Sequence, residues 1–320
     1  MNPKSIFSVS LKGNIETLRI SIPTLLKLYP DATYYLIVRK EDVLYFESEL
    51  KFCTGVVVID EASLISYEDF LATYHAVALL NEVRPHEKRL RWYYQQVLKI
   101  IFALQFQECS PEKYPMVMFD ADTIPLKKIK FFNDGNQSVL YGSLSECHED
   151  YFKSIECLFG SFERPAMGFT TQFFSVTLPE SLHLKKILSS CDFNNDETNL
   201  SLLIARAVLI STIRAHGTIE GSKFSEQELF GLSNRSCSGS IDQKPIFSFR
   251  SWILSKSLSR VQMRLLAILG IALLTYEKRC AFDSRRLGFV DFLRILIGDI
   301  RPQIKKYVDL RISKPHLNKV

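Results

Sequence analysis

Apolar and polar residues alternate along the first third of the chain in a way that predicts strands separated by helices. Residues 6–10 are typical of a short strand, and residues 13–29 have apolar side chains at the spacing of one helix face, before Pro30. Residues 33–38 and 55–59 are short apolar runs typical of strands buried in a sheet. This order of elements favours a parallel α/β sheet.

The same pattern leads to a pair of aspartates. Residues 86–108 carry apolar side chains at helical spacing, and residues 116–119 predict a buried strand that ends at Asp120. In open α/β sheets, ligands bind beyond the carboxyl ends of the strands. Asp120 and Asp122 therefore stand where a ligand is expected.

Beyond Asp122 the pattern is weaker. Residues 138–142 predict a strand, residues 170–176 contain extended pieces, and residues 200–214 predict a helix. No linker rich in Pro, Gly or Ser and no repeat divides the chain. We therefore expect one main α/β domain over residues 1–250 and a helical, basic C-terminal appendage over residues 251–320.

Composition and charge indicate an ordinary globular protein. Hydrophobic residues make up 47% of the chain and charged residues 23%, which excludes a disordered chain. The net charge of +5 is too small to indicate nucleic-acid binding. Seven cysteines occur singly, without a C-x-x-C pair, and the amino terminus lacks the long apolar run of a secretory signal. These features favour reduced thiols and a cytoplasmic location.

Asp120 and Asp122 lie in MVMFDADTIP (116–125), an apolar strand that breaks into two carboxylates one residue apart. Such a pair can flank a hard divalent cation, which prefers oxygen ligands and can bridge the phosphate oxygens of a departing nucleoside diphosphate. The alternative is a solvated turn, in which both aspartates are ordinary turn formers. Their place after an apolar strand in an α/β pattern favours the metal site.

Four segments in this order resemble a known family. They are WYYQQVLKI (92–100), MFDADTIP (118–125), GFTTQFF (168–174) and FSEQELFG (224–231). Together they resemble a bacterial group of glycosyltransferase-like proteins known as domain of unknown function 6492. That group typically carries a W-Y-x-Q-Q-x-L-K helix, a D-A-D strand end and a T-E-Y-x-L-Y-G segment. The similarity covers roughly residues 5–250.

The resemblance implies a GT-A-like, Rossmann-type mixed sheet flanked by helices, which uses a nucleotide-sugar donor and a divalent metal, Mn²⁺ or Mg²⁺. It implies that Asp122 binds the metal directly, while Asp120 reaches the ribose or a metal-bound water. The expected acceptor is a surface polysaccharide or a glycolipid. Two alternatives stay open: a nucleotidyl- or phosphosugar-transferase with the same metal site, and a non-catalytic sugar- or membrane-binding protein with this fold.

The helix before the aspartates offers four candidate donor-binding residues. Trp92, Gln95, Gln96 and Lys99 lie near one another because residues three and four apart share a helix face. Lys99 could balance diphosphate charge, and the glutamines could bind donor or acceptor hydroxyls. The alternative is a helix that merely covers the sheet, with its glutamines in water.

The FSEQELFG segment supplies a candidate base. Ser225 precedes two acids at the start of a predicted helix, so we expect it to be the N-cap. Glu226 matches the family's acid and is the first candidate for the general base that an inverting transferase needs near the acceptor hydroxyl. Glu228 falls at a variable position of the family and ranks lower. Gln227 replaces the usual tyrosine, which leaves the acceptor contacts open.

The GFTTQFF stretch adds hydroxyl and amide groups suited to sugar recognition, from Thr170, Thr171 and Gln172. Threonines are equally what strand propensity alone would place there. The six histidines are dispersed, and of these His216 is a candidate third metal ligand.

The C-terminal appendage combines apolar and basic residues. Residues 265–274 form an apolar run too short to cross a bilayer, which needs about 20 residues. We expect this run to form a buried or interfacial helix. Residues 289–297 are again apolar, and residues 301–320 carry six Lys and Arg residues against Asp309. This arrangement is typical of enzymes that lie on an anionic membrane face. The alternative is two packed helices with a solvated basic end.

Overall fold

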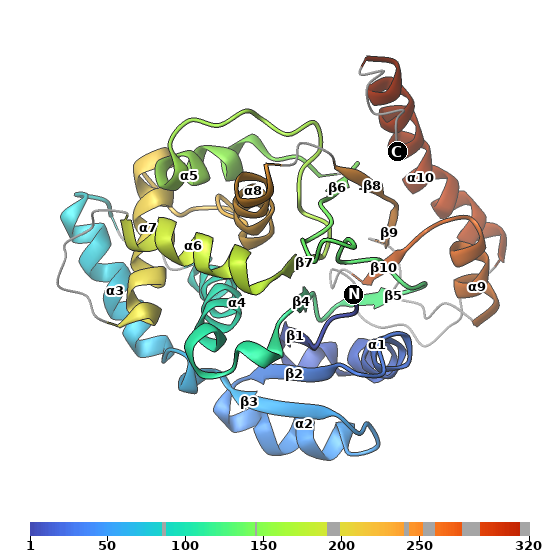
Figure 1. Ribbon diagram of the computed structural model, residues 1–320, viewed down its shortest axis with the longest axis horizontal. Helices are drawn as coiled ribbons and strands as arrows, with labels where there is room; N and C mark the ends of the chain where they lie inside the picture. Colours follow the sequence, from blue (N-terminus) through green and yellow to red (C-terminus); the bar gives the residue numbers. More distant parts are fainter. Residues whose placement is uncertain are drawn as a thin grey trace.

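A mixed five-stranded sheet forms the centre of the computed structural model, which describes residues 1–84, 88–144, 146–190, 199–239, 243–251, 260–276 and 289–313 (Figure 1). The strand order is β3–β2–β1–β4–β7. The first four strands in the chain are parallel, and β7 runs antiparallel to β4. The strands are β1 (Ser5–Val9), β2 (Thr33–Val38), β3 (Val56–Asp60), β4 (Met116–Phe119) and β7 (Phe173–Val176). The predicted α/β class with a mixed sheet flanked by helices is confirmed.

Helices cover both faces of this sheet because successive strand residues point to opposite sides. Ile6 and Val117 face α1 (Ile15–Leu28) and α2 (Val43–Leu50), whereas Phe7 and Met118 face the larger helical layer. Figure 1 shows α1 and α2 on one side of the strands and α4, α6 and α8 on the other. The larger layer consists of α3 (Tyr67–Leu80), α4 (Leu90–Cys109), α5 (Glu149–Phe159), α6 (Leu178–Ser190), α7 (Leu200–His216) and α8 (Glu226–Ser238).

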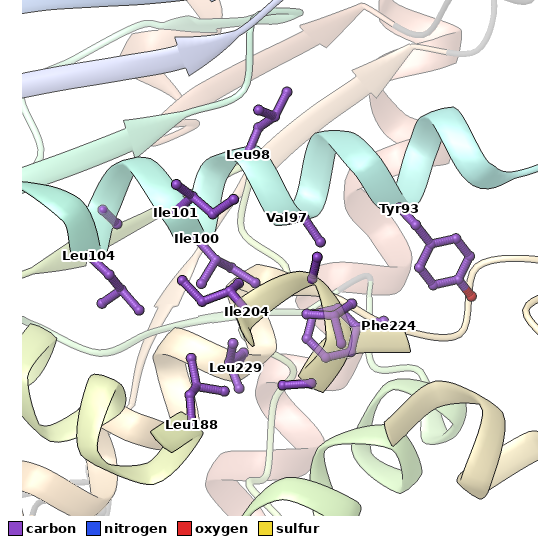
Figure 2. Close-up of a cluster of buried hydrophobic side chains, with 14 of the residues drawn as sticks. Tyr93, Val97, Leu98, Ile100, Ile101, Leu104, Leu188, Ile204, Phe224 and Leu229 are labelled. Atoms are coloured by element: carbon purple, nitrogen blue, oxygen red, sulfur yellow. The ribbon is translucent and has the colours of Figure 1, made fainter. Parts of the chain in front are cut away.

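Helix α4 lies between the sheet and the other helices. In Figure 2, Leu98 points toward the strands, while Ile100 and Leu104 point toward Ile204 and Leu188 of neighbouring helices. All five of these side chains are fully buried. A helix with apolar contacts on two sides is held firmly in place. This packing fixes the helix that carries Lys99.

Several predicted elements differ from the structure. Residues 55–59 were expected to form a buried strand, but β3 is an edge strand and Val57 is 42% exposed, because β3 has a neighbour on one side only. Residues 138–142 yield a shorter strand, β6 (Tyr141–Ser143), which pairs with β8 (Lys244–Ile246). The predicted helix over 86–108 is α4, and its first predicted residue, His86, lies outside the described residues.

The prediction of one helix over residues 265–274 is wrong. Helix α9 (Arg260–Ile268) ends before Gly270, whose φ of 86° is the left-handed conformation that commonly ends helices. The chain then forms β10 (Leu273–Tyr276), which lies between β5 (Thr123–Pro125) and β9 (Ser248–Ser251) in a second sheet. The strand that directly follows Asp122 is therefore paired with a segment close to the C-terminus.

The described chain ends in α10 (Phe289–Ser313), which packs with α9 on a small apolar core around Leu266, Phe292 and Leu296. Among the described helices, none combines the length and the hydrophobicity needed to cross a bilayer. The predicted division at residue 250 remains a prediction. Of the predicted basic tail, Lys314 and Lys319 lie outside the described residues.

Candidate functional site

The candidate site lies where the order of the central sheet reverses. Strands β2 and β3 extend the sheet on one side of β1, and β4 and β7 extend it on the other. Since β1 and β4 are parallel, their carboxyl ends meet at one edge. Ser8 ties the two strands together there, since its hydroxyl donates to the Phe119 carbonyl and contacts the Tyr34 hydroxyl at 2.6 Å. Open α/β sheets bind ligands at this position, and Asp120 is the first residue beyond β4.

A buried ion cluster surrounds Asp120. The Lys99 Nζ of α4 donates to Asp120 Oδ1 at 2.6 Å and to Glu226 Oε1 at 2.8 Å. Lys99 is 7% exposed and Glu226 is 2% exposed. Burial opposes the charge on Lys99, but the attraction of the two carboxylates outweighs it, so its pKa is raised. Burial raises the pKa of Glu226, against the opposing pull of Lys99. One ammonium thus compensates two carboxylates brought together from distant segments.

Gln227 closes a ring of hydrogen bonds around the same aspartate. Its Nε2 donates to Asp120 Oδ2 at 2.9 Å, and its Oε1 accepts from the Gln172 backbone N–H at 2.9 Å. The Asp120 backbone N–H in turn donates to the Gln172 carbonyl at 2.9 Å. Gln172 adopts a left-handed conformation, with φ of 70°. The Gln227 amide therefore serves as donor and acceptor at once, and it holds the second Asp120 oxygen.

The start of α8 supplies two of these partners, Glu226 and Gln227. Ser225 is the N-cap, and its hydroxyl accepts from the Glu228 N–H, which confirms the prediction. The next three side chains then point to different targets: Glu226 to Lys99, Gln227 to Asp120, and Glu228 to Thr170. This first turn of α8 organises the site.

Glu228, ranked low from the sequence, is fully buried. Its Oε1 accepts from the backbone N–H and the hydroxyl of Thr170 at 3.2 and 3.0 Å. Its Oε2 is buried and has no hydrogen-bond partner among the described residues. Burial raises the pKa of Glu228 to about 7. The sequence did not indicate that Glu228 is buried, because its burial results from the approach of residues 168–170.

The remaining predicted residues come from α4, the segment before β7 and the end of α7. On α4, Gln96 is buried, whereas Trp92 and Gln95 are half-buried. The Thr171 hydroxyl donates to the Phe173 carbonyl at 2.9 Å, a local contact of the kind that strand structure alone would produce. His216 lies in the last turn of α7, with its Nε2 3.0 Å from the Asp150 carbonyl oxygen of α5.

The two aspartates fit a cation that takes few protein ligands. Within the described parts of the chain, no group of three or more His, Cys, Asp or Glu residues is placed to hold a metal. Mg²⁺ is commonly bound by one or two carboxylates, with waters and substrate phosphates in the other positions. Asp122 is half-buried, and each oxygen of Asp120 accepts one hydrogen bond from Lys99 or Gln227. Such a site would leave most positions on the cation to water and to the phosphates of the donor.

Fold and site together define an α/β protein with a mixed sheet and a charged cluster at the point where the strand order reverses. No family model and no curated protein matches the chain. The resemblance to domain of unknown function 6492 therefore remains a prediction.

Solved structures of glycosyltransferases are similar to the chain. An active-site variant of LgtC is 11% identical with a TM-score of 0.48, over 93% of this chain and 99% of the other. The galactosyltransferase LgtC with donor and acceptor sugar analogues is 10% identical with a TM-score of 0.46, over the same shares. Mouse xyloside xylosyltransferase 1 is 8% identical with a TM-score of 0.41, over 89% and 100%. At these values, none of them assigns a substrate, a metal or a residue role to this chain.

Proposed function

We propose that this chain transfers a sugar from a nucleotide-sugar donor to a glycan or lipid-linked acceptor of a surface polysaccharide or glycolipid. The observation that carries the proposal is the setting of Asp120. It stands at the carboxyl end of a central parallel strand, with both oxygens held by Lys99 and Gln227, and Asp122 follows two residues later. A carboxylate oriented so tightly at a ligand-binding edge is suited to a defined partner rather than to bulk solvent.

The donor half of the site rests on the two aspartates. Asp122 and Asp120 would hold a divalent cation together with the donor's diphosphate. When bound, such a cation neutralises charge that develops on the departing nucleoside diphosphate. Lys99 and Gln227 hold Asp120 in a fixed orientation, and two carboxylates already compensate the Lys99 charge. We assign Trp92, Gln95, Gln96, Thr171 and Gln172 to the surroundings of the donor.

The acceptor half rests on Glu226. A transferase that inverts the sugar needs a carboxylate to take the proton of the acceptor hydroxyl. Burial raises the pKa of Glu226, which makes its carboxylate a stronger base than an exposed one. Lys99 fixes its Oε1 at 2.8 Å, so the direction of the carboxylate is set before substrate arrives. Glu226 is therefore the proposed general base.

Donor binding is the direct test. Nucleotide-sugars are screened by thermal shift with and without Mn²⁺, because a ligand at 100 times its Kd stabilises the folded state by about 2.7 kcal/mol. We expect one donor class to raise the Tm in a Mn²⁺-dependent manner and to be hydrolysed slowly. Asp122→Asn should abolish both effects, whereas Asp134→Asn, at an exposed aspartate, should change neither.

Three results separate the alternatives. Binding without turnover would identify a non-catalytic sugar-binding protein, and transfer of a nucleotidyl or phosphosugar group would identify the related enzyme class. Full metal-dependent turnover in Asp122→Ala would remove the proposed role of the aspartate pair.

For the base, Glu226→Gln should lower kcat by about 10²–10⁴-fold with little change in donor binding.

A further inference from the structure

Helix α10 has apolar side chains on two of its faces. Its inner face packs against α9 and the second sheet, where the buried Gln303 donates to the Ser248 carbonyl at 2.8 Å. Its outer face carries large aliphatic residues at intervals of seven, four and four positions, which places them on one stripe of the helix. They are Ile297 (62% exposed), Ile304 (49%), Val308 (46%) and Ile312 (74%). We call these four residues the outer stripe.

Helix α9 extends this apolar surface. Leu269, which is 55% exposed, follows α9 and lines an open groove of about 810 Å³ together with Ile297, Ile300 and Ile304 of α10. Its neighbour Ile268 is 80% exposed. The outer stripe is therefore part of a patch that spans two elements. Contiguous apolar patches of this kind mark interaction surfaces, whereas single exposed apolar residues need no explanation.

Positive charge accompanies the patch. Arg301 and Lys305 are exposed and line the same groove, and Arg264 is exposed on α9. Asp299 stands five residues from Ile304, which is about 140° around the helix at 100° per residue, whereas Asp309 is three residues from Ile312 and four from Lys305. Among the described side chains of α10, Arg301 and Lys305 thus border the outer stripe, with Asp309 at its rim.

We infer that the outer stripe and its flanking cations bind the surface of an anionic lipid bilayer. An apolar face bordered by Lys and Arg can bury its aliphatic groups at the headgroup boundary while the cations meet lipid phosphates. A second copy of this chain is a poorer occupant, because a two-fold interface buries the same patch on both copies and so gathers Arg301 and Lys305 of each copy in one interface. The charge of the patch therefore selects an anionic partner.

Hydrogen bonds connect α10, which carries the outer stripe, to the candidate site through the second sheet. Gln303 joins α10 to β9, β9 pairs with β10, and β10 pairs with β5, which begins directly after Asp122. Docking through α10 would hold the carboxyl edge of the central sheet at a fixed place relative to the bilayer. This consequence rests on the proposed function, because it gives the transferase access to a lipid-linked acceptor.

Vesicle binding by the full chain tests the inference. Co-sedimentation is measured with vesicles of phosphatidylcholine mixed with phosphatidylglycerol, and with vesicles of phosphatidylcholine alone. We expect binding to the anionic vesicles that weakens with added salt. The double variant Ile297→Asp/Ile304→Asp should lose this binding. Arg301→Gln/Lys305→Gln should weaken it on the order of 30-fold, from about 1 kcal/mol for each cation.

A matched control keeps the result specific. Leu79→Asp makes the same type of change at an 81% exposed residue of α3, which lies at the opposite end of the molecule in Figure 1, and should bind as the wild type does. Thermal unfolding verifies that every variant is folded. The inference is overturned if the wild type ignores anionic vesicles, or if the double Asp variant binds them equally well.

The inference also fails if analytical ultracentrifugation shows a dimer that the double Asp variant dissociates, without vesicle binding by the wild type. That result would assign the patch to a second copy. Donor binding is measured without vesicles, so a failure here leaves the proposed function standing. Conversely, a chain that binds vesicles but no nucleotide-sugar would overturn the proposed function alone.

Discussion

Lysines in two regions of the molecule have opposite surroundings. Lys99 is almost fully buried at the carboxyl edge of the central sheet, where two carboxylates contact its Nζ. Lys305 is exposed on α10, beside the aliphatic outer stripe. A buried charge must be compensated within the protein, whereas an exposed one is solvated and can meet an outside partner. The first arrangement builds a preorganised site, and the second builds a contact surface.

Helices α4 and α10 differ in the same way, in how much of their surface the protein covers. Helix α4 is in contact with the sheet and with other helices, so its apolar side chains are covered by the protein itself (Figure 2). Helix α10 covers one face and leaves the outer stripe in water. The difference teaches that apolar residues at helical spacing identify a helix but do not reveal what covers each face.

The largest difference in stability is expected between substitutions of Lys99 and Lys305. Lys99→Met leaves Asp120 and Glu226 buried without their shared cation, and breaking a buried ion pair in this way costs about 3–5 kcal/mol of unfolding free energy. Lys305→Met removes an exposed charge and should leave stability nearly unchanged. Urea unfolding of both variants measures the contrast. Equal effects would contradict the assigned role of Lys99 as the charge that holds the cluster together.

The buried acid Glu228 should make the stability of the protein depend on pH. The folded pKa of Glu228 is raised from 4.5 to about 7, so the folded state binds the proton more tightly than the unfolded chain. Its contribution is fully present below pH 4.5 and is lost as the pH rises through 7. Glu228→Gln should therefore gain stability relative to wild type between those values, by about 3 kcal/mol in total. Urea unfolding of Glu228→Gln and of the wild type from pH 5 to pH 8 measures this gap, and a gap that does not widen as the pH rises would contradict the buried setting of Glu228.

Substitution of a buried glutamine should lower activity at the candidate site but not on α10. Gln227→Leu removes the donor to Asp120 and the acceptor for Gln172, and losing such a supporting contact typically lowers metal affinity or activity about 10–100-fold. Gln303→Leu removes a hydrogen bond between α10 and β9, remote from Asp120. Its turnover should match the wild type. Steady-state kinetics with varied Mn²⁺ gives the comparison, and normal kinetics in Gln227→Leu would show that the ring is not needed for function.

Alanine substitutions at two helical glycines should change the stability of the protein in opposite directions. A Cβ at Gly231 of α8 would lie 2.1 Å from the Phe169 ring, so Gly231→Ala must displace packed atoms and should destabilise by about 1–3 kcal/mol. A Cβ at Gly298 of α10 meets nothing within 4 Å, so Gly298→Ala should stabilise by about 0.5–1 kcal/mol. Thermal melts test both. Stabilisation at Gly231 would mean that α8 does not press against residues 168–170 as described.

Local patterns made part of the site predictable. The strand over residues 116–119, the helix that carries Lys99 and the N-cap at Ser225 all follow from short-range spacing and capping chemistry. The carboxyl-edge position of Asp120 follows from the same patterns, because strand ends in a parallel sheet meet at one edge. The metal, the donor and the roles of these residues are still predictions.

Long-range contacts could not be read from the same patterns. The ring through Gln227 joins residues 55 and 107 positions apart and depends on the left-handed backbone of Gln172. Burial of Glu228 depends on the approach of Thr170, 58 positions away. Residues 265–274 were misjudged because an unbroken apolar run suits a helix or a strand equally. Gly270 was the available signal for the break.

The pairing of β5 with β10 has a consequence for how the molecule is made. Thr123 and Thr275 are 152 positions apart and their hydroxyls lie 3.1 Å from each other, so β5 acquires this neighbour only after most of the chain has left the ribosome. A fragment that stops at residue 250 would carry both aspartates and yet leave an unprotected strand edge beside them. Unprotected edges recruit other chains. Such a fragment is therefore expected to precipitate rather than to yield a minimal enzyme.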